Sequence, residues 1–160
     1  MTANKISIRA ATEADLARLK GFEQGVIQAE RPFDQTLSPD PIHYYDMQAL
    51  LNNSDSLLVV AEVNLGGTNQ ELIGSGYARI EKAKPYVNYS FYSYLGFMYV
   101  KPEFRGQGVI QQIIDYLATW SSKQGVNMMH LDVFAENQAA IRAYQKAGFQ
   151  ANLVEMRRAI

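Results

Sequence analysis

Residues 100–110 are the segment that most constrains the fold of this 160-residue chain. They have the pattern of a strand end, a turn carrying Gly106 and Gly108, and a helix starting at Val109. Such a turn aims unpaired backbone N–H groups and the positive end of a helix dipole at one point. We therefore predict an anion-binding site at residues 106–110, with a pyrophosphate as the expected ligand.

Two widespread phosphate motifs do not fit this turn. A nucleotide P-loop follows its glycines with Lys-Ser or Lys-Thr, and a dinucleotide fold shows Gly-x-Gly-x-x-Gly after an early strand. Here Arg105 precedes the glycines and can add a charge-assisted contact to an anion, while the glycines let the backbone approach without Cβ atoms in the way. The alternative is an ordinary glycine-rich helix start that binds nothing.

A second informative segment covers residues 137–149. Asn137 suits the N-cap of a helix that Gly148 and Phe149 end. Tyr144 lies two turns after Asn137 on nearly the same face, so one helix edge presents an amide and a phenol. Simple capping by Asn137 and simple packing by Tyr144 are the alternatives.

Together the two segments resemble the acetyl-CoA site of the GCN5-related N-acetyltransferase (GNAT) family. Residues 105–110 are similar to the family turn Arg/Gln-x-x-Gly-x-Gly/Ala, and residues 144–149 to its Tyr-x-Lys-Ala-Gly-Phe ending. The resemblance is strong over residues 95–149 and extends to residue 6 by element order. It implies a GNAT-like acyl-CoA N-acyltransferase fold of α/β class, an α+β mixed sheet that is mostly antiparallel, with helices on both faces.

The resemblance also implies which residues bind acetyl-CoA. The backbone of a central strand would hold the pantetheine arm as an added strand, and the turn would hold the pyrophosphate. The positions carried over are Met98, Val100, Arg105, Gly106, Gln107, Gly108, Val109, Ile110, Asn137 and Tyr144. Ile110 departs from the family, which has glycine or alanine there. Its side chain must either point into the core or hinder the phosphate.

Two catalytic roles follow from the resemblance. Tyr144 would act as the general acid that protonates the departing CoA thiolate. Asp132 stands five residues before Asn137, where related N-terminal acetyltransferases carry a glutamate base, and its shorter side chain favours a bridging water. Strand alternation places His130, Asp132 and Phe134 on one face. His130 is a second candidate base, and a solvated carboxylate with a packed histidine is the alternative.

Composition excludes several other functions. The net charge of −1 and the absence of a Lys/Arg run argue against binding to nucleic acids or membrane surfaces. The chain has no cysteine, which excludes disulfides and thiol catalysis, and its two histidines lack metal-ligand spacing, so no metal is expected. No apolar run reaches the length of a membrane span. We expect a soluble cytoplasmic protein whose residues 1–160 form a single N-acetyltransferase domain.

Periodicity predicts the order βααβββαβαβ. The first strand contains Ile6 and Ile8, and helices are expected from Ala14 to about residue 26 or 29 and from Asp40, as N-cap, to about Leu51. The remaining elements are a 56–63/71–80 hairpin turned by Gly66 and Gly67, strands 92–100 and 128–134, helices 109–125 and 137–147, and a last strand over 151–158. Gly96 within strand 92–100 predicts a bulge or a close backbone approach.

Aromatic residues gather near the expected acceptor entrance. Tyr44, Tyr45, Tyr86 and Tyr89 are expected to form a substrate wall or a dimer surface, although packing alone also explains them. With one strand after Phe149 where the family often has two, the sheet edge is open or completed by a partner chain, which predicts a homodimer.

The sequence thus predicts an N-acetyltransferase that moves an acetyl group from acetyl-CoA to a primary amine by direct attack in a ternary complex. The acceptor, a small molecule or a protein N-terminus or lysine, is left open. The competing hypotheses are a non-catalytic acyl-CoA-binding or sensing domain and an enzyme that uses a longer acyl group.

Overall fold

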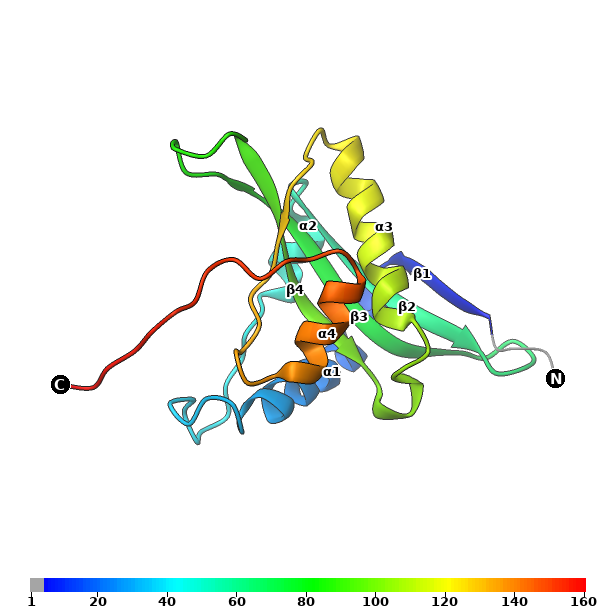
Figure 1. Ribbon diagram of the computed structural model, residues 1–160. Helices are drawn as coiled ribbons and strands as arrows, with labels where there is room; N and C mark the ends of the chain where they lie inside the picture. The colour runs from blue at the N-terminus through cyan, green and yellow to red at the C-terminus, as the bar shows by residue number, and fades with distance from the viewer. Residues whose placement is uncertain (1–4) are drawn as a thin grey trace.

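The computed structural model describes residues 5–160 and contains one five-stranded sheet in the order β1-β2-β3-β4-β5 (Figure 1). The strands are β1 (Ile6–Ala10), β2 (Ser56–Asn64), β3 (Gln70–Lys82), β4 (Phe91–Val100) and β5 (Met129–His130). Neighbours pair antiparallel from β1 to β4, and β5 joins β4 in parallel. The predicted mostly antiparallel mixed sheet is confirmed.

Helices cover both faces of this sheet. The structure has α1 (Leu16–Glu30), α2 (Met47–Asn52), α3 (Val109–Lys123) and α4 (Gln138–Lys146), with short 3₁₀ turns at Glu13–Asp15 and Pro102–Phe104. Apolar residues of α1 and α2 form one core cluster with β2, β3 and β4. Residues of α3 and α4 pack on a second cluster against the opposite face. No helix within residues 5–160 is long and apolar enough to cross a membrane.

Local sequence signals account for most element boundaries. The backbone N–H of Thr12 donates to the Asp15 carboxylate (2.8 Å), the predicted cap at the start of the first helical segment. Gly66 and Gly67 both have positive φ, as the turn between β2 and β3 requires. The predicted element order is confirmed from β1 to α4.

The predicted helix from Asp40 to Leu51 is wrong in its first half. The α2 helix begins only at Met47, and Asp46 is its N-cap, accepting a bond from the Ala49 N–H (2.9 Å). The preceding backbone is held by Glu23, a carboxylate only 1% exposed, which accepts the N–H groups of Tyr44 (2.7 Å) and Tyr45 (3.0 Å). Those two N–H groups bond to a buried acceptor on α1.

Two strand predictions also need correction. β5 is two residues long rather than the predicted 128–134, because β4 and β5 pair only at two positions and then diverge. The predicted last strand over 151–158 is wrong: residues 150–160 contain no helix or strand and leave the body as an extended tail (Figure 1).

Candidate functional site

The turn between β4 and α3 has the backbone shape that the sequence predicts. Gly106 (φ 73°) and Gly108 (φ 77°) lie in the left-handed region, which glycine adopts without strain. A Cβ atom built on either glycine meets no heavy atom within 4 Å, so the space outside the turn is open. Gly108 is also the N-cap residue of α3, so the positive end of the helix dipole lies next to this open space.

Side chains around the turn leave its outer surface accessible. Val109 is buried, and Ile110 packs against the core cluster under α3. Of the two arrangements predicted for Ile110, packing on the core is therefore the one that the structure has. Arg105 is exposed, and its Nε donates to the Val100 carbonyl (2.9 Å), while Gln107 donates to the Glu103 carbonyl (3.0 Å).

The strand β4 carries an irregularity at its centre. Phe97 is buried and has φ 56°, an uncommon conformation for a non-glycine residue, and the β3–β4 register shifts there. A Cβ at Gly96 would lie 2.5 Å from the Tyr77 ring, so only glycine fits, and the predicted bulge and close approach are both confirmed. Beyond Tyr94, β4 and β5 separate into a fork with Met98 and Val100 on its β4 arm.

The predicted residues of α4 lie next to the fork. Tyr144 packs on the same core cluster as Met98, Val100 and Ile110, so residues from three predicted segments come together. Burial, aided by the negative charge of Glu30, raises the pKa of Tyr144 to about 12. Asn137 caps α4, because its side chain accepts a hydrogen bond from the Ala140 N–H (3.2 Å). This is the capping role that the sequence offers as an alternative to a contact with the cofactor.

The predicted base, Asp132, follows β5, the second arm of the fork. Asp132 is exposed and accepts a hydrogen bond from the Tyr94 hydroxyl (3.0 Å). Burial, followed by the Asp132 charge, raises the pKa of Tyr94 well above its ordinary value. His130 stacks on Tyr92, with ring centroids 3.9 Å apart, and its Nε2 bonds to the Tyr89 hydroxyl (2.9 Å). This packing matches the alternative in which His130 is structural.

Glu30, the last residue of α1, is a titratable group that sequence reasoning missed. Burial raises the pKa of its carboxyl, against the opposing effect of a hydrogen bond from Tyr44. Its charge also contributes to raising the pKa values of Tyr44, Tyr45 and Tyr144, which places it among these phenols. Nothing in the sequence pattern marks Glu30, because only the packing of α1 against the sheet brings it there.

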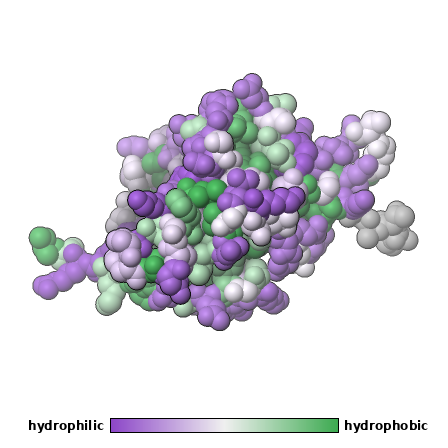
Figure 2. Space-filling view, turned by 90° about the horizontal axis from the view of Figure 1, so that it is seen from above, coloured by the Kyte–Doolittle hydropathy of each residue, from purple (hydrophilic) through white to green (hydrophobic). Residues whose placement is uncertain are grey.

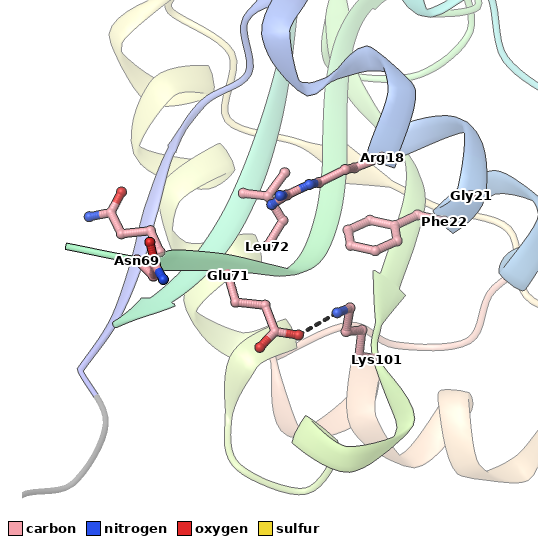
Figure 3. Close-up of a pocket in the computed structure, with 8 residues that line it drawn as sticks. Arg18, Gly21, Phe22, Asn69, Glu71, Leu72 and Lys101 are labelled. Atoms are coloured by element: carbon pink, nitrogen blue, oxygen red, sulfur yellow. Dashed lines mark hydrogen bonds and ion pairs between the residues drawn. The ribbon is translucent and has the colours of Figure 1, made fainter. Parts of the chain in front are cut away.

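Two hollows open on the α1 and α2 side of the sheet. One of about 120 Å³ is walled partly by Tyr44, Tyr45 and Tyr77, so two residues of the predicted aromatic wall line it. The other, of about 770 Å³, lies between α1 and the ends of β3 and β4 (Figure 3). It is lined by Arg18, Gly21, Phe22, Asn69, Gln70, Glu71, Leu72 and Lys101, and none of the predicted site residues is among them. Figure 3 shows Lys101 paired with Glu71 across this hollow.

Comparison with known proteins gives consistent results. The sequence model of the "Acetyltransferase (GNAT) family" matches residues 24–149. N-alpha-acetyltransferase 30 of Saccharomyces cerevisiae is 24% identical over 127 residues, which span 79% of this chain and 70% of the yeast protein.

Two solved structures show the same fold. A tetramutant of the BH1408 protein of Bacillus halodurans superimposes with a TM-score of 0.82 at 18% identity, covering 96% of this chain and 99% of that one. A predicted acetyltransferase of Clostridium acetobutylicum, solved with acetyl-CoA, has a TM-score of 0.71 at 19% identity, with 96% of both chains covered. With the family match spanning most of its length, this chain belongs to the GNAT family of acetyl-CoA-dependent N-acetyltransferases.

Proposed function

We propose that this protein transfers the acetyl group of acetyl-CoA to a primary amine by direct attack within a ternary complex. The observation that carries the proposal is that Val109 and Ile110, which directly follow the glycine turn, pack on the same core cluster as the β4 arm of the fork and Tyr144. Direct transfer fits a chain without cysteine, because no thiol nucleophile is present to form an acyl-enzyme.

The residues at the turn fit the pyrophosphate of acetyl-CoA. Backbone N–H groups of residues 106–110 would hold it at the N-terminus of α3, since the glycine backbone is uncovered and Ile110 points into the core. Arg105 would add its Nη groups, because within residues 5–160 only its Nε is hydrogen-bonded, to the Val100 carbonyl. The backbone of Met98 and Val100 would bond the pantetheine arm where β4 has no β5 partner.

Tyr144 would supply the proton for the departing thiolate. With its pKa raised to about 12, its phenol stays protonated at neutral pH. The thiolate would take this proton as the C–S bond breaks beside the hydroxyl, in buried surroundings that raise the pKa of a thiol as they raise that of the phenol. Asn137, on the same helix edge, would contact the cofactor through the side-chain atoms that capping leaves free.

Asp132 would accept the ammonium proton of the acceptor through a water molecule. Asp132 is exposed at the fork, so water reaches its carboxylate readily. The same carboxylate accepts a hydrogen bond from the Tyr94 hydroxyl. Glu30 is the second candidate base, favoured by its burial and its proximity to Tyr144. Asp132→Asn should reduce kcat/KM for the amine more than Glu30→Gln does, and the reverse order would transfer the role to Glu30.

Two measurements test the proposal as a whole. Calorimetric titration with acetyl-CoA, CoA and dephospho-CoA at fixed ionic strength should show saturable micromolar binding, and its absence would contradict the cofactor site. Release of free thiol is then followed with a panel of amines. Peptides with free α-amino groups come first, because the yeast relative is named an N-alpha-acetyltransferase; small amines and lysine peptides follow. Binding without thiol release for any amine would favour a sensing domain.

A further inference from the structure

Arg79 is a charged side chain that the proposed mechanism does not use. It lies on β3 opposite Tyr94 of β4. Its guanidinium carbon is 5.8 Å from the centre of the Tyr77 ring and 5.9 Å from the centre of the Tyr94 ring. Both rings pack on the core cluster of α1 and α2, so Arg79 lies on that face of the sheet. Attraction to two aromatic rings holds the guanidinium group in place.

Most hydrogen-bond donors of Arg79 are uncommitted. A guanidinium group has five N–H donors, and within residues 5–160 only the Nε of Arg79 is hydrogen-bonded, to the Glu81 carboxylate (2.5 Å). The two side chains are 43% and 36% exposed, and exposed ion pairs of this kind are weak. The Nη groups can therefore bind an anionic ligand, since a guanidinium matches the oxygens of a carboxylate or a phosphate.

The smaller hollow on this face, of about 120 Å³, gives an anionic group room beside Arg79. Arg79 is the one cation among the residues that line it, and Tyr44, Tyr45 and Tyr77 form part of its wall. The acidic residue in the lining, Asp46, is engaged at the start of α2, where its Oδ1 accepts the Ala49 N–H. The volume is several times that of a water molecule, which suits one carboxylate or phosphate group.

Charges of opposite sign flank the Tyr94 side chain. The Asp132 carboxylate accepts a hydrogen bond from its hydroxyl (3.0 Å), whereas Arg79 lies over its ring. Burial raises the pKa values of Tyr77 and Tyr94, Asp132 adds to this rise, and Arg79 opposes it. Asp132 and Arg79 therefore both act on the same two phenols. A molecule that spans Tyr94 meets a carboxylate at one end and a guanidinium at the other.

We propose that Arg79 determines specificity, by selecting small-molecule acceptors that carry a carboxylate or a phosphate a few bonds from their primary amine. The amine lies at Asp132, and the anionic group enters the smaller hollow and accepts hydrogen bonds from the Nη groups of Arg79. This assignment rests on the proposed function, because it takes Asp132 as the group that receives the amine. Figure 2 shows hydrophilic and hydrophobic residues closely mixed over one face of the molecule, so that face offers no broad apolar area to a large partner.

A set of amines that differ only in their distal group tests the selectivity. Thiol release is compared for 4-aminobutanoate, 3-aminopropyl phosphate, the neutral 4-aminobutanamide and the cationic 1,4-diaminobutane, with shorter and longer homologues of each. For at least one chain length, kcat/KM for the carboxylate or the phosphate should exceed that for the amide by about 10- to 100-fold, the usual value of hydrogen bonds to a charged group. The better of the two anions identifies the group. No preference for an anion, or one confined to acidic peptides, would overturn the proposal.

Three variants assign the preference to Arg79. Arg79→Gln should raise KM for the anionic amines by about 10- to 100-fold and leave both the neutral amide and the affinity for acetyl-CoA little altered. Lys82→Gln removes the same charge from an exposed position on the same strand and should keep the preference. Glu81→Gln frees the Nε of Arg79 and should lower KM for the anionic amines alone. An equal loss for every amine in Arg79→Gln would mean that Arg79 only supports the packing of its two tyrosines, which would overturn the proposal.

A binding measurement separates failure of this proposal from failure of the proposed function. The preferred anionic amine is titrated by calorimetry into the natural chain and into Arg79→Gln, each saturated with CoA, so that no reaction takes place. Binding that depends on Arg79 without thiol release from acetyl-CoA would support the anion site and contradict the transferase. Thiol release without a preference for anionic amines would do the reverse. Neither thiol release nor binding that depends on Arg79 would overturn both.

Discussion

At the scale of single residues, the chemistry depends most on Tyr144. Tyr144→Phe keeps the ring that packs against Phe149 and removes only the hydroxyl. We expect kcat to fall on the order of 10²–10⁴-fold, the usual contribution of a positioned general acid. Thiol release with a known acceptor is followed between pH 7 and 9, where the phenol, with its pKa of about 12, keeps its proton. Tyr116→Phe, on the exposed side of α3, is the control, and an unchanged rate in Tyr144→Phe would refute the assignment.

The glycine turn allows a test with a matched internal control. Gly108 and Gly125 lie at opposite ends of α3 with nearly equal φ angles, 77° and 78°, and a Cβ meets nothing at either position. Replacing either with alanine should cost about 1 kcal/mol of unfolding free energy through left-handed strain. Only Gly108→Ala should also weaken acetyl-CoA binding in calorimetry. Equal affinities in the two variants would remove Gly108 from the cofactor site.

At the scale of elements, sequence predicts best where local chemistry decides the structure. Thr12 and Asp15 mark a helix start, and Gly66 and Gly67 mark a hairpin, because each acts on its own neighbours in the chain. The start of α2 could not be predicted in the same way, since it depends on Glu23, about twenty residues away.

In the candidate site too, features set by neighbouring residues could be predicted, whereas features set by tertiary packing could not. The turn at residues 105–110 is recognisable because its glycines and helix start are contiguous. Glu30 escapes notice because only tertiary packing brings it near Tyr144. The residues of strand 128–134 have the predicted alternation, but its length depends on neighbours that the segment itself does not specify.

Glu23 makes the α1–α2 region sensitive to acid. Burial opposes its ionisation, yet hydrogen bonds from His43, Tyr45 and Tyr44 hold the pKa of its carboxyl below the ordinary value of 4.5. Its contribution to stability is therefore complete above about pH 4.5 and is lost as pH falls through the lowered folded-state pKa.

Glu23→Gln should lower the free energy of unfolding by about 1–3 kcal/mol at pH 7, because bonds to a charged acceptor are replaced by weaker ones. Denaturant titrations should show this difference shrinking below about pH 4.5. Glu13→Gln, at an exposed side chain, serves as the control and should change little. A deficit that stays constant down to pH 3 would mean that packing, not charge, explains the effect.

At the scale of the whole molecule, cofactor binding and stability are linked through the fork. In the described part of the chain, the backbones of β4 and β5 pair as strands only at Ser93–Met129 and Tyr94–His130, so the bound pantetheine would bridge the two strands where they diverge. A ligand that binds only the folded state stabilises it by mass action. Acetyl-CoA at one hundred times its dissociation constant should therefore add about 2.7 kcal/mol to the free energy of unfolding.

For a chain of this length that stabilisation corresponds to a rise in Tm of about 5–10 °C, measurable by differential scanning fluorimetry. Gly108→Ala should show a smaller rise at the same acetyl-CoA concentration, and Gly125→Ala the full one, because the two variants share their strain but not their contact with the cofactor. If all three proteins shift equally, acetyl-CoA is held elsewhere than at the turn. If the natural chain does not shift at all, the fork does not bind the cofactor, and the fold has lost the site that its family membership implies.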